Sequence, residues 1–119
     1  NYRNNPEWQI AIELQNKFPD LPLILDPSHI AGRRDIIFDL CQTALGLNYD
    51  GFMVETHHDP DNAWSDAAQQ VTPSNLIKII KDLKIRKIKH HQNRNRSSLS
   101  NQIRPKQFQI MHLILCRFH

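Results

Sequence analysis

Apolar residues recur at helical spacing in three parts of the chain, which predicts three amphipathic helices. The first covers residues 5–18, with Asn5 as N-cap, Pro6 at the first helical position and Pro19-Asp20 after its end. The second covers residues 36–45, with Gly46 as a natural C-cap, and the third opens at Thr72-Pro73-Ser74 and ends at Leu83. Their apolar faces consist of Trp8, Ala11, Ile12, Leu14 and Phe18, then Ile36, Ile37, Leu40, Cys41, Ala44 and Leu45, then Leu76, Ile77, Ile79, Ile80 and Leu83.

Two short apolar runs between these helices predict strands. Residues 21–25 and 51–55 are apolar at nearly every position, as a strand buried on both faces of a parallel sheet requires. The order is therefore helix, strand, helix, strand, helix, which predicts an α/β fold with parallel pairing and right-handed crossovers. Residues 56–70 are polar, and Asp61 is a candidate cap for a short helical turn there.

A parallel pair of strands with three helices leaves both sheet edges open and offers little core. We therefore expect these elements to be part of a larger α/β sheet or barrel. The chain begins at Asn1 rather than Met, which leaves open that the sequence starts partway through a longer protein.

Charge divides the 119 residues into two segments. Residues 1–82 hold six Lys and Arg and all twelve Asp and Glu, whereas residues 83–119 hold nine Lys and Arg and no acidic residue. A folded surface normally mixes both signs. We expect a folded segment at residues 1–85 and a basic tail at residues 86–119 that is poorly ordered, weakly helical or aberrant. Residues 110–116 form a small apolar cluster without partners in this tail.

Cysteine usage and hydropathy point to the cytoplasm. Cys41 and Cys116 are far apart and form no CxxC motif, which fits a reducing compartment better than a disulfide scaffold. No stretch approaches the roughly 18–20 apolar residues of a membrane span, and none resembles a signal peptide.

The chemistry-bearing residues follow the strands. The C-terminal ends of parallel strands form the functional face of α/β proteins; His29 follows the first strand, Glu55 closes the second, and Asp66 lies in the next loop. One imidazole nitrogen and two carboxylates suit a divalent ion such as Mn, Fe, Co or Zn. Other interpretations are that His29 is a loop hydrogen-bonder and Glu55 a helix cap. His57-His58 is a competing ligand pair, although consecutive residues in a strand point to opposite faces.

The motifs together carry a family resemblance. Leu23-Ile24-Leu25-Asp26-Pro27-Ser28-His29, then Gly32-Arg33-Arg34, then Gly51-Phe52-Met53-Val54-Glu55-Thr56-His57, then Ser65-Asp66 with Gln69 follow one another. Over roughly residues 2–85 this order resembles the C-terminal part of 3-deoxy-D-arabino-heptulosonate 7-phosphate (DAHP) synthase, in the branch similar to the 3-deoxy-manno-octulosonate 8-phosphate synthases. The Gly-Arg-Arg run favours the heptulosonate enzyme, and a fragment of an octulosonate (KDO-8-phosphate) synthase is the alternative.

The resemblance implies an incomplete TIM (βα)8 barrel whose seventh and eighth strands are those predicted here. It implies a divalent metal held by His29, Glu55 and Asp66 together with a Cys from the first strand. The reaction implied is a transfer that condenses phosphoenolpyruvate with erythrose 4-phosphate and water, giving DAHP and phosphate. This reaction opens the shikimate pathway to chorismate and the aromatic amino acids. Full-length members are expected to be homo-oligomers, and some relatives continue into a chorismate mutase domain that residues 86–119 do not resemble.

Both implied substrates carry phosphate, for which Arg33 and Arg34 are candidate ligands. The alternative is that they are solvated residues at a helix start. Neither Cys41 nor Cys116 stands where the family's metal-binding Cys belongs. We therefore expect the isolated chain to be an inactive fragment of the synthase.

Two other function classes remain open at this point. The nine positive charges of residues 84–119, with His90-His91 and Arg94-Asn95-Arg96, suit a basic arm that binds nucleic acid. Phe108 and Phe118 are the aromatic residues of this arm, so base stacking has little support and we do not expect this partner. The third class is a regulatory or pseudoenzyme remnant that pairs with a full-length synthase.

Overall fold

A parallel pair of strands lies at the centre of the protein, whose computed structural model describes residues 1–85 and the strand at 111–113. Strand β1 (Ile24–Leu25) pairs with strand β2 (Gly51–Met53) in the register Ile24 to Gly51 and Leu25 to Phe52. Helix α3 (Ile37–Gly46) is the crossover between them. The predicted parallel α/β pairing is confirmed.

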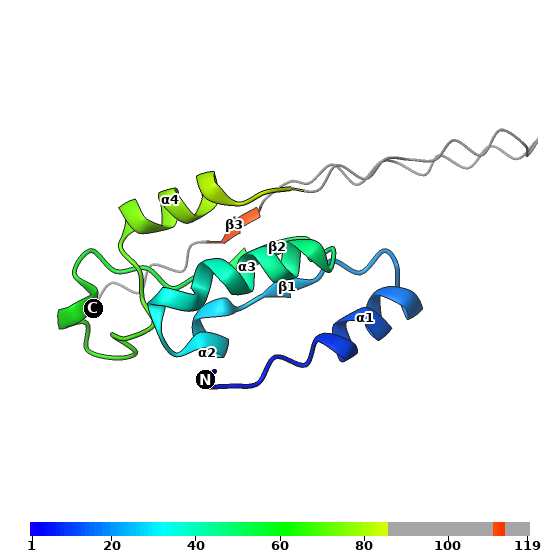
Figure 1. Cartoon of the computed structure of the whole chain (residues 1–119), viewed down its shortest axis with the longest axis horizontal. Helices are drawn as coiled ribbons and strands as arrows, with labels where there is room; N and C mark the ends of the chain where they lie inside the picture. The colour runs from blue at the N-terminus through cyan, green and yellow to red at the C-terminus, as the bar shows by residue number, and fades with distance from the viewer. Residues whose placement is uncertain (86–110, 114–119) are drawn as a thin grey trace, which may run out of the picture.

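The predicted helices correspond to α1 (Trp8–Lys17), α3 and α4 (Pro73–Asp82). Figure 1 shows α3 crossing in front of β1 and β2, with α1 and α4 on either side of it. Burial of apolar area is the main stabilising contribution to such packing, and α3 supplies the largest share of it. The buried core comprises Ala11, Leu25, Ala31, Ile37, Leu40, Cys41, Ala44, Tyr49, Val54, Val71 and Leu76.

Two predicted helix ends are wrong. Helix α1 begins at Trp8 rather than at Pro6, because the backbone N–H groups of Arg3 and Asn4 donate to the Ile30 carbonyl and tie the preceding segment to α2. Helix α3 is preceded by the 3-10 turn η1 (Arg34–Ile36) and includes Gly46 as its last residue. The left-handed turn that follows it falls on Asn48, a residue type that tolerates positive φ.

The start of α4 is confirmed. The Thr72 side chain accepts a hydrogen bond from the backbone N–H of Asn75, and Pro73 occupies the first turn. Its buried face is narrower than predicted, since Leu76 is 7% exposed and Ile77 is 53% exposed. Ile77 faces solvent, whereas Ile79, Ile80 and Leu83 are partly buried against the core.

The strands are shorter than predicted, and β1 is not buried on both faces. Residues 21–23 lie outside the β1 pairing, and β2 stops at Met53. Leu25 is 4% exposed whereas its neighbour Ile24 is 46% exposed. Successive strand residues point to opposite faces. The helices therefore cover one face of the pair, and the described residues leave Ile24 uncovered on the other.

The tail contributes one strand that the sequence did not predict. Strand β3 (Met111–Leu113) pairs in parallel with β2, giving the order β1-β2-β3, so the expectation of two strands and of a partnerless cluster at 110–116 is corrected. The free backbone groups along the edge of β2 explain this pairing. The predictions for the rest of the basic tail concern residues 86–110 and 114–119, which lie outside the described residues.

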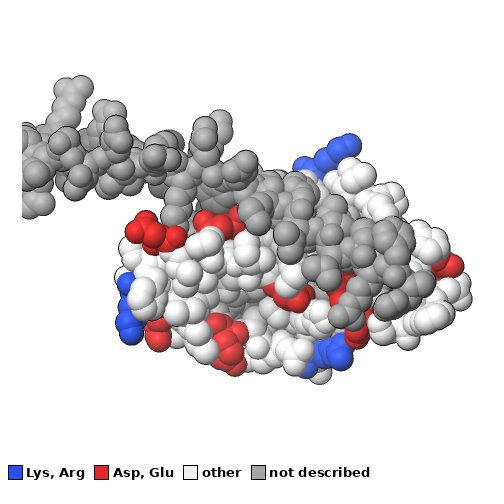
Figure 2. All heavy atoms as spheres, turned by 180° about the vertical axis from the view of Figure 1, so that it is seen from behind, with Lys and Arg blue, Asp and Glu red and all other residues white. Residues whose placement is uncertain are grey.

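Acidic side chains outnumber basic ones in the described segment, and they are visible on its surface. In the view from behind, Asp and Glu are dispersed over the face and Lys and Arg lie at its margins (Figure 2). Among the described residues, no helix is long and apolar enough to cross a membrane.

Candidate metal centre

Three side chains from separate segments meet beyond the C-terminal ends of β1 and β2. His29, Glu55 and Asp66 each offer one ligand atom, and these atoms lie within 4.8 Å of one another. The structure therefore brings together the residues that the sequence singled out. Each is only partly covered: their side chains are 48%, 19% and 30% exposed, so an ion from solvent can reach them.

His29 lies on a short helix that the sequence did not predict, α2 (Pro27–Ala31), directly after β1. Asp26 caps this helix, since its Oδ1 accepts the backbone N–H of His29 at 3.1 Å. The other Asp26 oxygen lies 2.8 Å from His29 Nδ1. With the proton on Nδ1, the lone pair of Nε2 is available on the side of Glu55, whose Oε1 is 3.7 Å away.

Glu55 follows the end of β2 and caps no described helix, so the helix-cap alternative is wrong. Its backbone N–H donates to the hydroxyl of Ser28 at 3.0 Å, and Ser28 is fully buried. Its Oε2 accepts a hydrogen bond of 2.8 Å from Gln69. The Ser28 contact ties the end of β2 to α2 and brings Glu55 beside His29.

Asp66 lies in the long loop between β2 and α4, and a parallel bridge between Thr56 and Val71 closes the base of this loop. Its backbone is left-handed, with φ of 52°, which a short polar side chain tolerates at some cost. The Arg3 guanidinium donates to Asp66 Oδ1 at 2.8 Å. The position of Asp66 thus depends on a residue from the start of the chain.

A turn within this loop, η2 (Pro60–Asn62), corrects the prediction for Asp61. Asp59 stands at the N-cap position, and Asp61 instead pairs with Arg34 at 2.8 Å. Arg34 also donates to the carbonyl of Ala67 at 2.6 Å. Arg34 therefore holds the loop to the start of α3.

Arg33 makes a local pair with Asp35 through two hydrogen bonds. Both groups are exposed, and the hydrogen bonds from Arg33 lower the pKa of the Asp35 carboxyl. The structure thus engages Arg33 and Arg34 with carboxylates, and their expected role as phosphate ligands remains a prediction.

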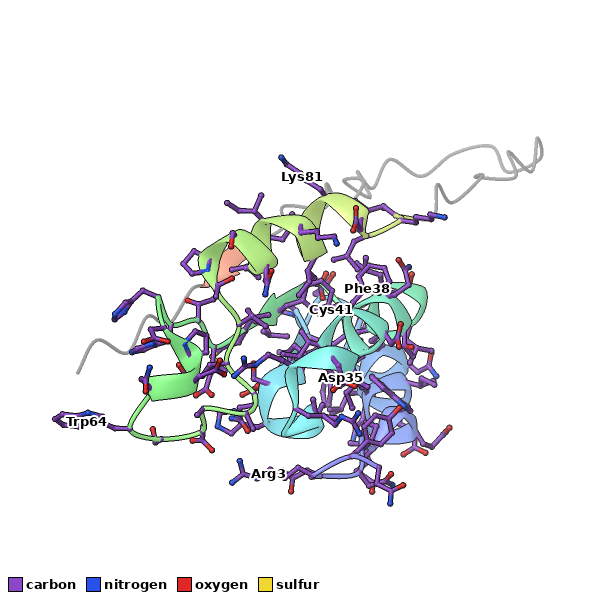
Figure 3. The ribbon with its side chains drawn as sticks, turned by 60° about the vertical axis from the view of Figure 1, so that its left-hand side comes forward. Arg3, Asp35, Phe38, Cys41, Trp64 and Lys81 are labelled. Atoms are coloured by element: carbon purple, nitrogen blue, oxygen red, sulfur yellow. The ribbon has the colours of Figure 1, made fainter. Side chains whose placement is uncertain are left out.

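His57 and His58 lie outside the cluster. Their rings stack at 4.4 Å between centroids. Neither residue belongs to a strand, so the rule that consecutive strand residues point to opposite faces does not apply to them. They line a cavity of about 170 Å³ together with Asp59, Asn62, Ala63, Trp64, Ser65 and Gln70. Trp64, 88% exposed, extends away from the body of the protein (Figure 3).

Cys41 is no ligand for this site. It lies on the buried face of α3 and is 1% exposed (Figure 3), and burial raises the pKa of its thiol to about 12. Metal binding requires the thiolate, which this environment disfavours. Cys116 lies outside the described residues.

Sequence reasoning missed the residues that hold the ligands in place, namely Asp26, Ser28, Arg3 and Gln69 as partners of His29, Glu55 and Asp66. Asp26, Ser28 and Gln69 stand within the motifs of the family resemblance, which was a usable signal. Arg3 had none, because it lies 63 positions from Asp66 along the chain.

The donor set fits a divalent ion. One neutral imidazole and two carboxylates carry a charge of about −2, which offsets that of the ion, and they form a mixed hard and borderline set. Ligands about 2.1 Å from a common ion lie about 3–4 Å apart. Small side-chain adjustments from separations of at most 4.8 Å reach that geometry.

Relatives of known activity share this segment. Over 74 residues the chain is 32% identical to a phospho-2-dehydro-3-deoxyheptonate aldolase of Thermotoga maritima, covering 62% of this chain and 22% of that protein. A 2-dehydro-3-deoxyphosphooctonate aldolase of Bartonella bacilliformis is 33% identical over 73 residues, covering 52% of this chain and 26% of that protein. The chain thus spans about a quarter of the length of these relatives.

Two solved structures of a DAHP synthase resemble this chain as well. The crystal structure of the DAHP synthase of Thermotoga maritima superposes with a TM-score of 0.61 at 31% identity, covering 67% of this chain and 23% of that one. A truncated form of the enzyme from the same organism gives a TM-score of 0.60 at 31% identity, covering 67% and 30%. The family model described as the DAHP synthetase I family matches residues 3–97. The chain therefore belongs to the DAHP synthetase I family of aldol-type transferases.

Proposed function

We propose that residues 1–85 form the C-terminal part of a TIM (βα)8 barrel, with β1 and β2 as its seventh and eighth strands. The parallel pairing of β1 with β2 and the crossover through α3 support this assignment. So does the uncovered face at Ile24, which in a closed barrel packs against other strands. The boundary at residue 85 stays a prediction.

The proposed role of this segment is to supply three ligands of a divalent metal site, His29, Glu55 and Asp66. The observation that carries the proposal is their convergence within 4.8 Å at the C-terminal ends of the strands, where barrel enzymes hold their active sites. Mn, Fe, Co and Zn all suit the donor set. The family resemblance adds a Cys as a further ligand, and Cys41 does not fulfil this role.

The reaction proposed for the whole enzyme is condensation of phosphoenolpyruvate with erythrose 4-phosphate and water to DAHP and phosphate. When bound, a divalent ion supplies Lewis acidity for the aldehyde oxygen of erythrose 4-phosphate. This chain's residues provide the ligand geometry: Asp26 fixes the ring of His29, and Ser28 fixes the backbone of Glu55. The match to the heptonate aldolase covers 62% of this chain and that to the octonate aldolase 52%, which supports DAHP as the product.

Arg33 and Arg34 are the proposed ligands of a substrate phosphate. Phosphate is a bidentate acceptor that competes with carboxylates for guanidinium groups. Arg33 is 52% exposed and Arg34 33% exposed, so both are accessible to an anion. Binding by either residue requires that phosphate displace its present partner, Asp35 or Asp61.

Titration of the chain with Co²⁺, followed by visible absorption and calorimetry, tests the metal site. We expect one ion per chain and at least a 100-fold loss of affinity in His29→Ala, because the imidazole is the nitrogen donor of the set. His58→Ala is the matched control, since it removes an exposed histidine outside the cluster and should leave affinity unchanged. Equal affinity in His29→Ala and the unchanged chain, or loss in His58→Ala alone, would contradict the assignment.

Assay of the 119-residue chain with both substrates tests the expectation that it is inactive alone. The described residues supply three ligands, whereas the family resemblance implies a fourth, a Cys, that Cys41 does not provide. We expect no consumption of phosphoenolpyruvate beyond that of a chain-free control, with or without Mn²⁺. Turnover that depends on His29 would show that the chain suffices for catalysis.

A further inference from the structure

Arg3 contacts the candidate metal centre from the opposite end of the described sequence. Its Nη1 donates to Asp66 Oδ1 and to Gln69 Oε1, both at 2.8 Å, and Gln69 Nε2 donates to Glu55 Oε2 at 2.8 Å. We infer that Arg3 is a positioning residue that orients two ligands of the metal site, Asp66 directly and Glu55 through Gln69. This inference rests on the proposed metal site.

Gln69 is a rigid link in this path. It is 1% exposed, and its amide has one orientation that satisfies both neighbours. A guanidinium only donates, so the amide oxygen must face Arg3; a carboxylate only accepts, so the amide nitrogen must face Glu55. A flipped amide would place its NH₂ group against the guanidinium, donor against donor, and its oxygen against the carboxylate, acceptor against acceptor. The Arg3 side chain therefore fixes the amide so that it donates to Glu55, which occupies Oε2 in this structure and leaves Oε1 on the side of His29.

The backbone of Arg3 is held against the helix that carries His29. Its N–H donates to the Ile30 carbonyl at 2.9 Å, and the Asn4 side chain donates to the His29 carbonyl at 2.7 Å. Gly32 makes room for this contact, since a Cβ there would lie 2.6 Å from the Cβ of Arg3. Arg3 thus connects the His29 helix to Asp66 and, through Gln69, to Glu55.

The positive charge of Arg3 and its positioning effect should change metal affinity in opposite directions. The direction of the change in an Arg3 variant therefore tells which effect is larger. A guanidinium beside a cation site repels the ion, whereas ordered partners of ligands typically raise metal affinity about 10–100-fold. If repulsion dominates, Arg3→Met binds an ion more tightly than the unchanged chain. If positioning dominates, Arg3→Met binds it more weakly, and Arg3→Lys, which keeps the charge without the planar fork, also binds it more weakly.

Co²⁺ titration of four variants of the full chain and one control variant tests this sign. We expect Arg3→Met, Arg3→Lys and Gln69→Leu each to lower affinity about 10-fold. The double variant Arg3→Met/Gln69→Leu should lose little more than Gln69→Leu alone if the two residues act along one path. Lys81→Met is the matched control: it removes one positive charge at the opposite end of the protein (Figure 3) and should not change affinity. Unchanged or tighter binding by Arg3→Met would overturn the inference.

A measurement without metal keeps the inference separate from the proposed function. The side-chain amide protons of Gln69 should give a distinct, slowly exchanging NMR signal in the unchanged chain, because the group is buried between two charged partners. Arg3→Met should shift that signal and speed its exchange, with Lys81→Met as control. If the chain binds no Co²⁺ but this signal responds, the metal proposal fails and the positioning by Arg3 stands. An unresponsive signal overturns the positioning whatever the metal result.

Discussion

The two segments that carry the candidate ligands are built in opposite ways. Residues 26–32, which carry His29, are organised locally: Asp26 caps α2, and Gly32 ends it in the left-handed conformation at φ of 63°. Residues 56–71, which carry Asp66, form a long loop whose anchors come from elsewhere in the chain. Arg34 holds it from the start of α3, and Arg3 holds it from the N-terminal segment.

This difference determines which changes in the structure disturb the orientation of each ligand. Local hydrogen bonds over a few residues form with little loop-closure entropy, whereas contacts between distant segments depend on the whole fold. His29 should therefore keep its orientation while α2 is intact, and Asp66 should lose its orientation whenever the remote anchors move.

Alkaline pH should destabilise the core on which both segments depend. Burial raises the pKa of the Cys41 thiol from 9.0 to about 12. Between these values the unfolded chain has lost this proton and the folded chain keeps it, so stability falls as pH rises from about 9, by at most about 1.4 kcal/mol per pH unit. Denaturant unfolding should show a flatter pH dependence in Cys41→Ala. An identical slope in both chains would contradict the assignment to Cys41.

Gly32→Ala should affect both segments at once. The left-handed backbone costs a Cβ-bearing residue roughly 1–2 kcal/mol, and the new methyl would meet the Arg3 Cβ at 2.6 Å. Urea unfolding should show at least this loss, and hydrogen exchange should speed at Asp66 as well as in α2. Gly46→Ala is the matched control, since a Cβ there meets nothing within 4 Å and Gly46 is helical. Equal stability of the two variants would be evidence against the close approach of Arg3.

Asp26→Ala should damage α2 alone, at a cost of about 1 kcal/mol. Asp26→Asn keeps a capping oxygen and should retain most of the helix, yet it replaces the carboxylate beside His29 Nδ1. Amide exchange at His29 should therefore speed in the Ala variant and change little in the Asn variant. Exchange at Val71, at the base of the loop, should stay unchanged in both, and acceleration there would break the contrast between the segments.

Arg34→Met should loosen the loop and leave α2 intact. The hydrogen bond from Arg34 to the Ala67 carbonyl is partly buried, so its loss should cost about 1 kcal/mol. Asp61→Asn tests the ion pair between Arg34 and Asp61 without removing the hydrogen bond to Ala67. Asp61 is 81% exposed, and exposed ion pairs contribute little to stability. Exchange of loop amides should speed in Arg34→Met only. A similar effect in Asp61→Asn would assign the anchor to the ion pair.

Elements with local signals were predicted most accurately from the sequence. Thr72-Pro73 marked the start of α4, and the apolar spacing of residues 36–45 marked α3, because capping and amphipathic periodicity act within a few residues. The start of α1 was misplaced at Pro6, since the hydrogen bonds of Arg3 and Asn4 to Ile30 overrode the local capping signal. Helix α2 was missed because five residues are too few for a periodic pattern.

The residue types of the candidate site, the order of α1, β1, α3, β2 and α4, and the family of the chain can all be inferred from the amino-acid sequence. Its motif spacing also made a meeting of His29, Glu55 and Asp66 at the strand ends predictable, because parallel strands present their C-terminal ends at one edge. Asp26 holds His29 locally, but the partners of Glu55 and Asp66 come from distant segments and become apparent only in the folded protein. Arg3 reaches Asp66 and Gln69 across more than half of the chain, and no pattern along the sequence encodes a contact that exists only once separate segments have packed together.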